Sequence, residues 1–321
     1  MTKKKVYITR IIDQNSIDFL KKHFDVEVNE KDAAVPRGEF LEKIKNADGV
    51  ISIHTDKIDG EAMEIGKNVK IFANCAVGYE NMDVKEARRR GVYVTNTPEV
   101  LSDTTAELAF ALLIGCARKI VDADNYTRNG EFKAWSSKNF LGYDIKGKTL
   151  GIIGAGRIGK SLAKKCTGFE MKIVYYNRKR DMEFEKDFNA KYVALDILLK
   201  EADFISLHTP LTKETFHLIG EKEFNQMKSN AILINTARGP VVDEKALVQA
   251  LKDKKIYGAG LDVYEDEPSF EPELKDLENV ILLPHIGSAT YETRARMAML
   301  AAKNIYEVLS DREPLTPIKD I

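Results

Sequence analysis

The sequence predicts an α/β protein built from two doubly wound parallel-sheet domains. At roughly 100–200 residues per domain, its 321 residues suggest two domains. Short apolar runs alternate with amphipathic stretches along the chain, as expected for parallel strands joined by helical crossovers. A glycine-rich turn at 154–159 directly follows one of these apolar runs. Each half of the chain therefore supplies its own sheet.

The first third of the chain contains five candidate strands. They are the apolar segments 6–8, 26–28, 50–53, 69–73 and 92–94. The expected helices between them are the amphipathic segments 16–23, 38–46 and 84–90. A turn signal at 96–98 comes next, and Ser102 or Asp103 can then cap an apolar helix that continues through Arg118. We expect this helix to be a buried connector between the domains.

The alternation restarts after Gly147 with stronger strand signals. The expected strands are 149–153, 172–176, 204–207, 231–234, 258–262 and 280–283, and 291–309 is typical of one long helix. Turn signals near Pro98 and Pro284 suggest a split domain, which the last helix rejoins. We expect one domain of residues 1–98 plus 289–321, with a second domain of residues 99–288 inserted into it.

Composition excludes several classes of protein. Lys plus Arg is 49 and Asp plus Glu is 50, so the formal net charge of −1 gives no global field for nucleic acid or an anionic membrane. The longest apolar run, 108–117, is about half the roughly 20 residues of a membrane span. Three distant cysteines without a CxxC pair predict neither a disulfide framework nor a metal site. Since the amino terminus also lacks a signal-peptide core, we expect a cytoplasmic protein.

The turn Gly154-Ala155-Gly156-Arg157-Ile158-Gly159 predicts a dinucleotide site. It follows a strand and opens a helix, which is the context that makes GxGxxG informative. The first glycine permits the turn, the second lets a pyrophosphate approach the backbone, and the third lets the helix pack on the strand. The phosphates would face the N–H groups at the start of that helix.

The residues after the next strand bear on cofactor choice. NAD-specific folds place an acidic residue there to bind the ribose 2′-hydroxyl, whereas this sequence has Asn177-Arg178-Lys179-Arg180. We therefore expect NADP(H) to be preferred, with NAD(H) still possible. Two alternatives stay open: the segment could be a solvated basic loop, or Asp181 could serve the NAD role from several residues past the strand.

Three chemically competent side chains follow strands of the second half. Arg238 follows 231–234, a carboxylate among Glu265, Asp266 and Glu267 follows 258–262, and His285 follows 280–283. Strand ends are where open α/β sheets bind ligands. The arginine can hold a 2-keto acid, the histidine can donate a proton to its carbonyl oxygen, and the carboxylate can keep the histidine protonated.

The chain resembles the D-isomer-specific 2-hydroxyacid dehydrogenase family over nearly its whole length, and within it is most similar to the glyoxylate/hydroxypyruvate reductases. The motifs that carry the resemblance are the glycine turn and the segments 76–79, 94–98, 105–107, 235–239, 260–263 and 284–288. The resemblance implies a Rossmann cofactor domain inserted into a flavodoxin-like substrate domain. It also implies reduction of a small 2-keto acid in the interdomain cleft.

The resemblance implies a role for individual residues. Arg238 would bind substrate, His285 would be the acid/base, and Glu267, rather than Glu265 or Asp266, would orient His285 because it immediately precedes Pro268. Substrate would also contact the backbone amides of Val77 and Gly78, an arrangement suited to anions. The implied cofactor contacts are Thr105, Ala155, Gly156, Arg157, Ile158, Asn177, Arg178, Lys179, Thr236, Ala237, Arg238, Asp262, His285 and Gly287.

Other members of the family remain alternatives. A short phosphoglycerate dehydrogenase or a D-lactate type shares the scaffold, although the chain ends at Ile321 without room for the regulatory domain of longer forms. A relative of the formate dehydrogenases would be expected to have glutamine at position 267, where this chain has glutamate. A non-enzymatic NAD(H)-sensing corepressor keeps the same triad but carries disordered tails, which this chain lacks.

The segment between the connector helix and Gly147 contains Trp135, the only tryptophan. In relatives this region forms a dimer arm that can reach the partner's active site, so we expect a homodimer. Simple interface packing would explain the tryptophan equally well.

Overall fold

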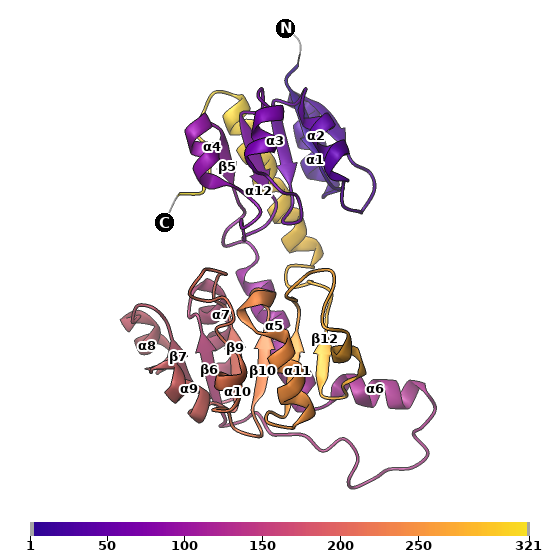
Figure 1. The fold of residues 1–321 in the computed structure, drawn as a ribbon, viewed down its shortest axis with the longest axis vertical. Helices are drawn as coiled ribbons and strands as arrows, with labels where there is room; N and C mark the ends of the chain where they lie inside the picture. Colours follow the sequence, from indigo (N-terminus) through magenta and orange to yellow (C-terminus); the bar gives the residue numbers. More distant parts are fainter. Residues whose placement is uncertain (1–2, 320–321) are drawn as a thin grey trace. The chain divides into compact units, whose positions relative to one another are not determined.

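The computed structural model describes residues 3–319, which separate into two compact units (Figure 1). The second unit is Ser102–Gly287, and the first consists of the described residues on either side of it. None of the described helices is long and apolar enough to cross a membrane.

The first unit contains a five-stranded parallel sheet in the order β2-β1-β3-β4-β5. Its strands are β1 (Lys5–Ile8), β2 (Asp25–Val28), β3 (Gly49–Ser52), β4 (Ile71–Asn74) and β5 (Tyr93–Thr95). Its helices are α1 (Gln14–His23), α2 (Arg37–Ile44), α3 (Gly60–Ile65), α4 (Val84–Arg90) and α12 (Tyr291–Leu309). The order is that of flavodoxin-like folds.

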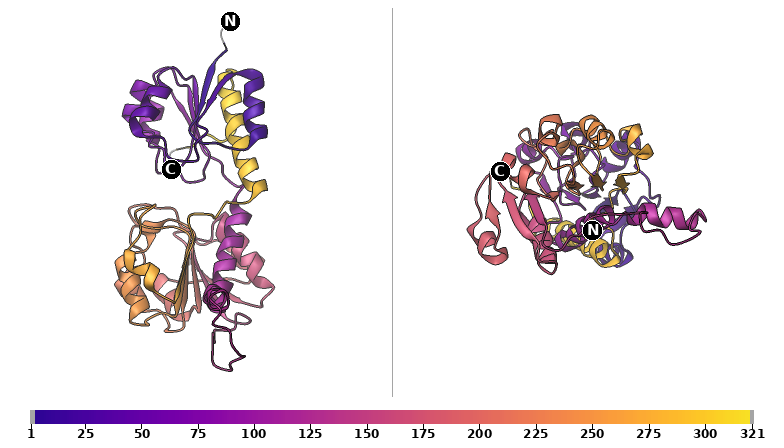
Figure 2. Two further views of the ribbon diagram at one scale, coloured as in Figure 1. Left: turned by 90° about the vertical axis from the view of Figure 1, so that its right-hand side faces the viewer. Right: turned by 90° about the horizontal axis from the view of Figure 1, so that it is seen from below.

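Helices cover both faces of this sheet (Figure 2, left). On one face, Phe40 and Ile44 of α2 and Met63 of α3 join the side chains of Val50 and Phe72 in one buried cluster. On the other face α12 lies across β3 and β4 beside α1. The return of the chain through α12 is therefore part of the core of the first unit, as expected for a split domain.

The second unit contains a seven-stranded parallel sheet in the order β12-β11-β10-β9-β6-β7-β8. Its strands are β6 (Thr149–Ile153), β7 (Lys172–Tyr176), β8 (Lys191–Tyr192), β9 (Phe204–Leu207), β10 (Ile232–Asn235), β11 (Gly258–Leu261) and β12 (Val280–Leu282). Its helices are α5 (Ser102–Ala117), α6 (Ile120–Arg128), α7 (Arg157–Thr167), α8 (Met182–Phe188), α9 (Leu195–Glu201), α10 (Glu221–Phe224) and α11 (Glu244–Lys252).

Two buried clusters sandwich this second sheet. Ile232 and Ile234 of β10 point into the cluster that includes α5 and α7, whereas Leu233 points into the one that includes α9 and α11. The alternation follows from the two-residue period of a strand buried on both faces. Strand order reverses at β6, which pairs with β7 on one side and β9 on the other. The carboxyl end of β6 is thus the switch point where such sheets bind ligands.

The two-sheet α/β architecture predicted from the sequence is confirmed, with local differences. Helix α5 ends at Ala117 instead of Arg118, because Lys119 takes a left-handed backbone conformation (φ 50°) and α6 starts directly after it. The strand expected at 69–73 runs from Ile71 to Asn74, since the amide of Val69 is bound in a turn to Gly66. Helix α6 itself went unpredicted, and none of its residues is buried.

Close packing of α9 on β6 predicts a stability effect at Gly151. A methyl group there would lie 2.6 Å from Leu198 Cδ2 and 2.9 Å from Ala202 Cβ. We expect Gly151→Ala to destabilise the second unit by about 1–3 kcal/mol through overpacking. The measurement is urea unfolding followed by circular dichroism. Gly168→Ala adds the same methyl group in the same unit where its nearest contact is 3.8 Å away, so it should change stability by less than about 0.5 kcal/mol. Equal stability of the two variants would show that β6 and α9 are less tightly packed than described.

Candidate active site

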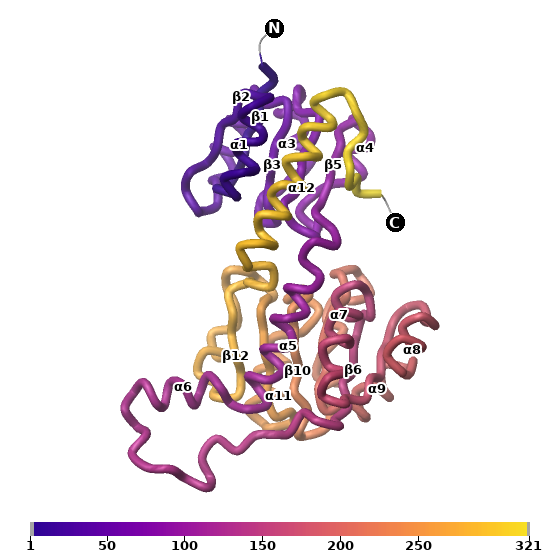
Figure 3. Tube along the Cα trace, turned by 180° about the vertical axis from the view of Figure 1, so that it is seen from behind, coloured from indigo at the N-terminus to yellow at the C-terminus, as the bar shows by residue number. Residues whose placement is uncertain are grey.

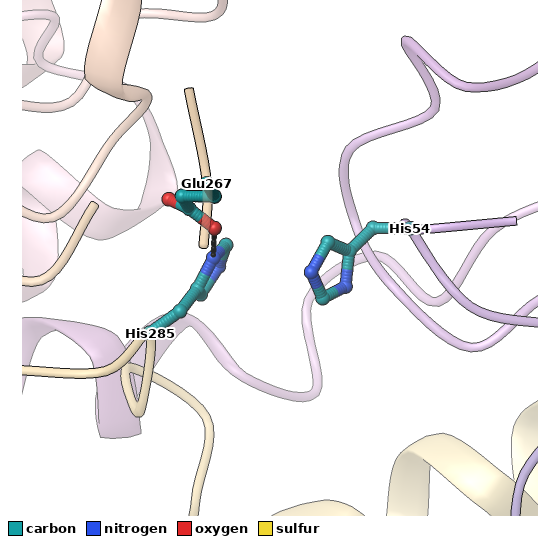
Figure 4. Close-up of side chains that lie close together, drawn as sticks. All are labelled: His54, Glu267 and His285. Carbon is teal, nitrogen blue, oxygen red and sulfur yellow. Dashed lines mark hydrogen bonds and ion pairs between the residues drawn. The ribbon is translucent and has the colours of Figure 1, made fainter. Parts of the chain in front are cut away.

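Glu267 and His285 form a hydrogen-bonded pair at the carboxyl edge of the second sheet. Glu267 Oε2 lies 2.7 Å from Nδ1 of His285 (Figure 4). Both side chains are partly exposed, at 27% and 34%. The loops that carry them follow β11 and β12, which are neighbours in the sheet. A carboxylate on Nδ1 fixes the orientation of the ring and leaves Nε2 as the nitrogen for proton exchange with a ligand. His54, also drawn in Figure 4, belongs to the first unit.

Backbone contacts fix the carboxylate of this pair. The amide of Tyr264 donates to Glu267 Oε1 at 3.0 Å, so each carboxylate oxygen has its own partner. The hydroxyl of Tyr264 donates to the carbonyl of Leu283, two residues before the histidine. Tyr264 therefore connects the loop of Glu267 with the loop of His285.

Asp262 anchors the residues that follow His285. Its two carboxylate oxygens accept the amides of Ile286 and Gly287, each at 2.7 Å, and the residue is only 1% exposed. Burial raises the pKa of Asp262 above its ordinary value, against the opposing effect of the two amides. Asp262 was predicted only as a cofactor contact. The structure shows that its carboxylate also holds the histidine loop.

Arg238 follows β10 and is held by its neighbours. Asn235 accepts the amide of Ala237 at 3.0 Å and donates to the carbonyl of Arg238 at 3.0 Å, which closes the turn. The guanidinium donates to the carbonyl of Ala237 at 2.6 Å. Gly239 is required here, since a Cβ would overlap the Tyr264 backbone. The turn that carries Arg238 therefore packs directly on the segment that leads to Glu267.

The glycine turn has the geometry expected of a phosphate site. Gly154 has φ 97°, and a Cβ there would come within 2.8 Å of the backbone of His208 and Thr209 after β9. A Cβ on Gly159 would lie 2.6 Å from the Gly154 carbonyl oxygen, so this glycine lets α7 pack on the turn. A Cβ on Gly156, by contrast, would meet open space. The turn is closed on its protein side and open where a pyrophosphate would approach.

Asn177 joins the end of β7 to the glycine turn, because its Oδ1 accepts the amide of Ala155 at 2.7 Å. The basic residues after it differ from one another. Arg180 forms a paired contact to both oxygens of Glu185, at 2.7 Å each. Within residues 3–319 the structure gives Arg178 and Lys179 no ion-pair partner.

Asp181 is already engaged within the protein. It caps α8 by accepting the amide of Phe184 at 3.0 Å, and Lys160 of α7 lies 2.9 Å from its other oxygen. The hydrogen bond from Lys160 lowers the pKa of Asp181, which keeps the carboxylate ionised. Its sequence position left it as a candidate for the ribose contact, whereas its contacts in the structure are structural.

Three of the expected cofactor contacts lie together. A Cβ on Gly287 would be 3.1 Å from Asp262 Oδ2 and 3.5 Å from Thr105 Oγ1. At the end of β10, the hydroxyl of Thr236 is buried without a hydrogen-bond partner among the described residues. A buried polar atom of this kind is satisfied when a polar ligand binds. The residues present thus fit a nicotinamide dinucleotide.

The first unit presents unpaired amides after β4. Within the described part of the chain, the amides of Val77 and Gly78 have no acceptor. Their carbonyls are occupied instead: Asn96 Nδ2 donates to the Val77 oxygen at 2.7 Å and Asn74 Nδ2 to the Gly78 oxygen at 2.8 Å. Successive unpaired N–H groups are suited to a carboxylate. The sequence did not predict these contacts of Asn74 and Asn96, because nothing in an asparagine's position reveals which carbonyl it will reach.

Two other histidines have partners of their own. His208 Nε2 lies 2.9 Å from Ser206 Oγ, and burial lowers the pKa of His208 to about 3, so its ring is neutral. His217 Nε2 lies 2.7 Å from Glu265 Oε1. Glu265 and Asp266 had both been candidates for the partner of His285. The geometry gives that contact to Glu267.

The segment after α5 leaves the body of the second unit as an extended excursion (Figure 3). It consists of α6 and a stretch at 129–146 with no helix or strand. Trp135 is 82% exposed, and Phe132 and Leu141 are exposed as well. Large apolar side chains on such a segment indicate a surface that another molecule covers.

Comparison with known proteins agrees with this geometry. Residues 110–287 match the family model of the NAD-binding domain of D-isomer specific 2-hydroxyacid dehydrogenases. A glyoxylate reductase of Thermococcus litoralis is 56% identical over 307 residues, which cover 94% of this chain and 93% of that protein.

Two solved structures have the same fold over almost the whole chain. The TT0316 protein of Thermus thermophilus has a TM-score of 0.93 at 42% identity, covering 98% of this chain and all of the other. The NADPH-dependent glyoxylate/hydroxypyruvate reductase of Sinorhizobium meliloti, solved with NADP and malonate, has a TM-score of 0.87 at 30% identity and covers 99% and 97%. With its glycine turn, its Glu267–His285 pair and these relatives, the chain belongs to the D-isomer-specific 2-hydroxyacid dehydrogenases, enzymes that use a nicotinamide cofactor.

Proposed function

We propose that the protein reduces glyoxylate, hydroxypyruvate or a similar small 2-keto acid to the D-2-hydroxy acid, and that it prefers NADPH. The observation that carries the proposal is the 2.7 Å contact between Glu267 and His285, at the same carboxyl edge of the sheet as a glycine turn suited to a dinucleotide. The glyoxylate reductase relatives support the substrate class.

In this reaction the residues of the chain have distinct tasks. Bound NAD(P)H supplies the hydride. His285 gives a proton from Nε2 to the carbonyl oxygen of the substrate, and Glu267 keeps the imidazole oriented and charged through Nδ1. Arg238 holds the substrate carboxylate and carbonyl through its fixed positive charge. The amides of Val77 and Gly78 supply further donors for the carboxylate.

The preference for NADPH is supported by the contacts that the charged side chains after β7 make within the protein. Asp181 is bound to Lys160 and caps α8, so it does not serve as the acidic ligand of a ribose 2′-hydroxyl. Arg180 is paired with Glu185. Arg178 and Lys179 are the two cations that can bind a 2′-phosphate, and a charge-assisted contact of this kind is stronger than a neutral one.

A substrate panel tests the function directly. Purified enzyme is assayed for oxidation of NADPH and NADH with glyoxylate, hydroxypyruvate, pyruvate and 3-phosphohydroxypyruvate. We expect turnover with the first two, and we expect His285→Ala to lower kcat by about 10²–10⁴-fold while the dissociation constant for NADPH stays within about twofold. Turnover only with 3-phosphohydroxypyruvate would move the substrate assignment to a short phosphoglycerate dehydrogenase. Activity that survives His285→Ala would overturn the assignment of the acid.

A paired substitution tests the cofactor preference. The double variant Arg178→Ser/Lys179→Ser should lower kcat/KM for NADPH by about 10–100-fold, because hydrogen bonds to a charged group contribute about 1.5–3 kcal/mol. Its kcat/KM for NADH should change little. Arg180→Ser removes a neighbouring cation of the same loop that is paired with Glu185, so it should leave the NADPH/NADH ratio within about twofold. If the wild type uses both cofactors equally well, the preference is wrong.

We also propose that the segment 120–146 forms a homodimer arm. Its exposed apolar side chains are those expected of an interface between two copies of this chain.

Light scattering on wild type and on Phe132→Ser/Leu141→Ser tests the arm. We expect a dimeric mass for wild type and a mass that falls toward the monomer, at low micromolar concentration, for the variant. Phe169→Ser, which removes an exposed apolar side chain elsewhere in the second unit, is the control and should stay dimeric. A monomeric wild type would contradict the proposed arm.

A further inference from the structure

Glu244 is a buried carboxylate behind the loop that carries Glu267. It is the first residue of α11 and only 4% exposed. Its Oε1 accepts the amide of Glu265 at 2.5 Å, and its Oε2 accepts the amide of Glu271 at 2.9 Å. These two amides lie on either side of Glu267. One side chain thus holds both ends of the segment 265–271.

The contact is reciprocal on one side. The amide of Glu244 donates to Glu265 Oε2 at 3.3 Å, and Glu265 Oε1 meets His217 at 2.7 Å. The start of the loop is therefore tied to α11 and, through His217, to the loop after β9. Burial raises the pKa of Glu244 above its ordinary value, and the two amides oppose that effect.

The middle of the segment needs such anchoring. Residues 266–269, Glu267 among them, are exposed, and the bridge between Asp266 and Ser269 pairs them with each other rather than with the body of the unit. Loops of this kind open at a low free-energy cost unless their ends are fixed. Displacement of the segment would lengthen the Glu267–His285 contact of 2.7 Å.

We propose that Glu244 is a positioning residue, which sets the strength of the Glu267–His285 contact by holding both ends of the loop between them. The proposal rests on the proposed function for its consequence in catalysis, but its structural part does not depend on the substrate. Glu244 does not touch His285. Charged side chains of the second unit that are placed against the histidine include Glu267, from the loop after β11, and Asp262, which holds the amides of Ile286 and Gly287.

Glu244→Gln tests the proposal with little change of shape. A glutamine side chain has one oxygen, so one of the two amides would face an NH₂ group and lose its acceptor. If the loop then loosens, the imidazolium of His285 loses part of its stabilisation by Glu267. We expect the pH midpoint of the His285 ring, followed by NMR in the NADP⁺-bound enzyme, to fall by at least about half a unit. The five histidines allow assignment by comparison with His285→Gln.

The matched control is Asp203→Asn. Asp203 is also a largely buried carboxylate of the second unit. It accepts a hydrogen bond from the amide of Thr149 at 2.9 Å and another from Lys228 Nζ at 2.9 Å. It precedes β9, at the end of the sheet opposite His285. Replacing the Asp203 carboxylate should lower the melting temperature of the protein without moving the pH midpoint of the His285 ring.

Kinetics of the same proteins provide the second measurement. We expect Glu244→Gln to lower kcat by about tenfold or more, as small displacements of catalytic groups do. The dissociation constant for NADPH should stay within about twofold. In the same variant, the pH above which kcat for reduction falls below half of its maximum should shift downward together with the NMR midpoint.

The outcomes separate the possibilities. A His285 midpoint that stays within about 0.2 units of wild type in Glu244→Gln overturns the proposal, and so does an equal fall in Asp203→Asn, which would indicate general loosening. If Glu244→Gln does not fold, Glu244→Asp, whose shorter side chain should not reach both amides, is judged by the same criteria. A wild type that reduces no 2-keto acid would contradict the proposed function, while the NMR midpoints would still decide the role of Glu244.

Discussion

The contact between Glu267 and His285 is the interaction on which the rest of the second unit's chemistry depends, and it exists because β11 and β12 are parallel neighbours. Parallel strands end at the same edge of a sheet, so the loops after them meet there. Two polar side chains 18 positions apart in sequence thus come within 2.7 Å. That pairing fixes the orientation of the imidazole ring.

Backbone amides, more than cations, satisfy the acidic groups around this pair. Glu267 accepts the amide of Tyr264, Asp262 accepts two amides after His285, and Glu244 accepts two amides of the loop. An amide keeps a buried carboxylate hydrogen-bonded without neutralising it. These carboxylates are therefore held through the backbone of the loops around the pair.

The sequence was sufficient for the architecture because each layer has a local signal. The strands 172–176 and 204–207 and the helix 291–309 have the bounds that their apolar patterns predict, and Gly154 and Gly159 have the turn and packing roles that the motif assigns to its first and third glycines. What it could not supply are contacts between segments. Asp181 looked available for a ribose, yet Lys160 and the cap of α8 engage it. Nothing in the sequence singled out Glu244, because only the fold brings its side chain to the loop of Glu267.

Because the fold, rather than the composition, brings binding groups together, net charge is a poor guide to this protein's ligands. A formal charge of −1 excludes a global attraction for polyanions, but both proposed anion sites are local. At residues 77–78, the first unit supplies amides that have no acceptor among the described residues, while Asn74 and Asn96 bind the carbonyls of the same two residues. At residues 154–159, the second unit supplies the start of α7, with open space beside Gly156. Backbone donors carry no net charge and are fixed by the fold, so neither site changes the composition. At Arg178 and Lys179, in contrast, formal charge would decide between NADP and NAD, because these two ligands differ by a single phosphate.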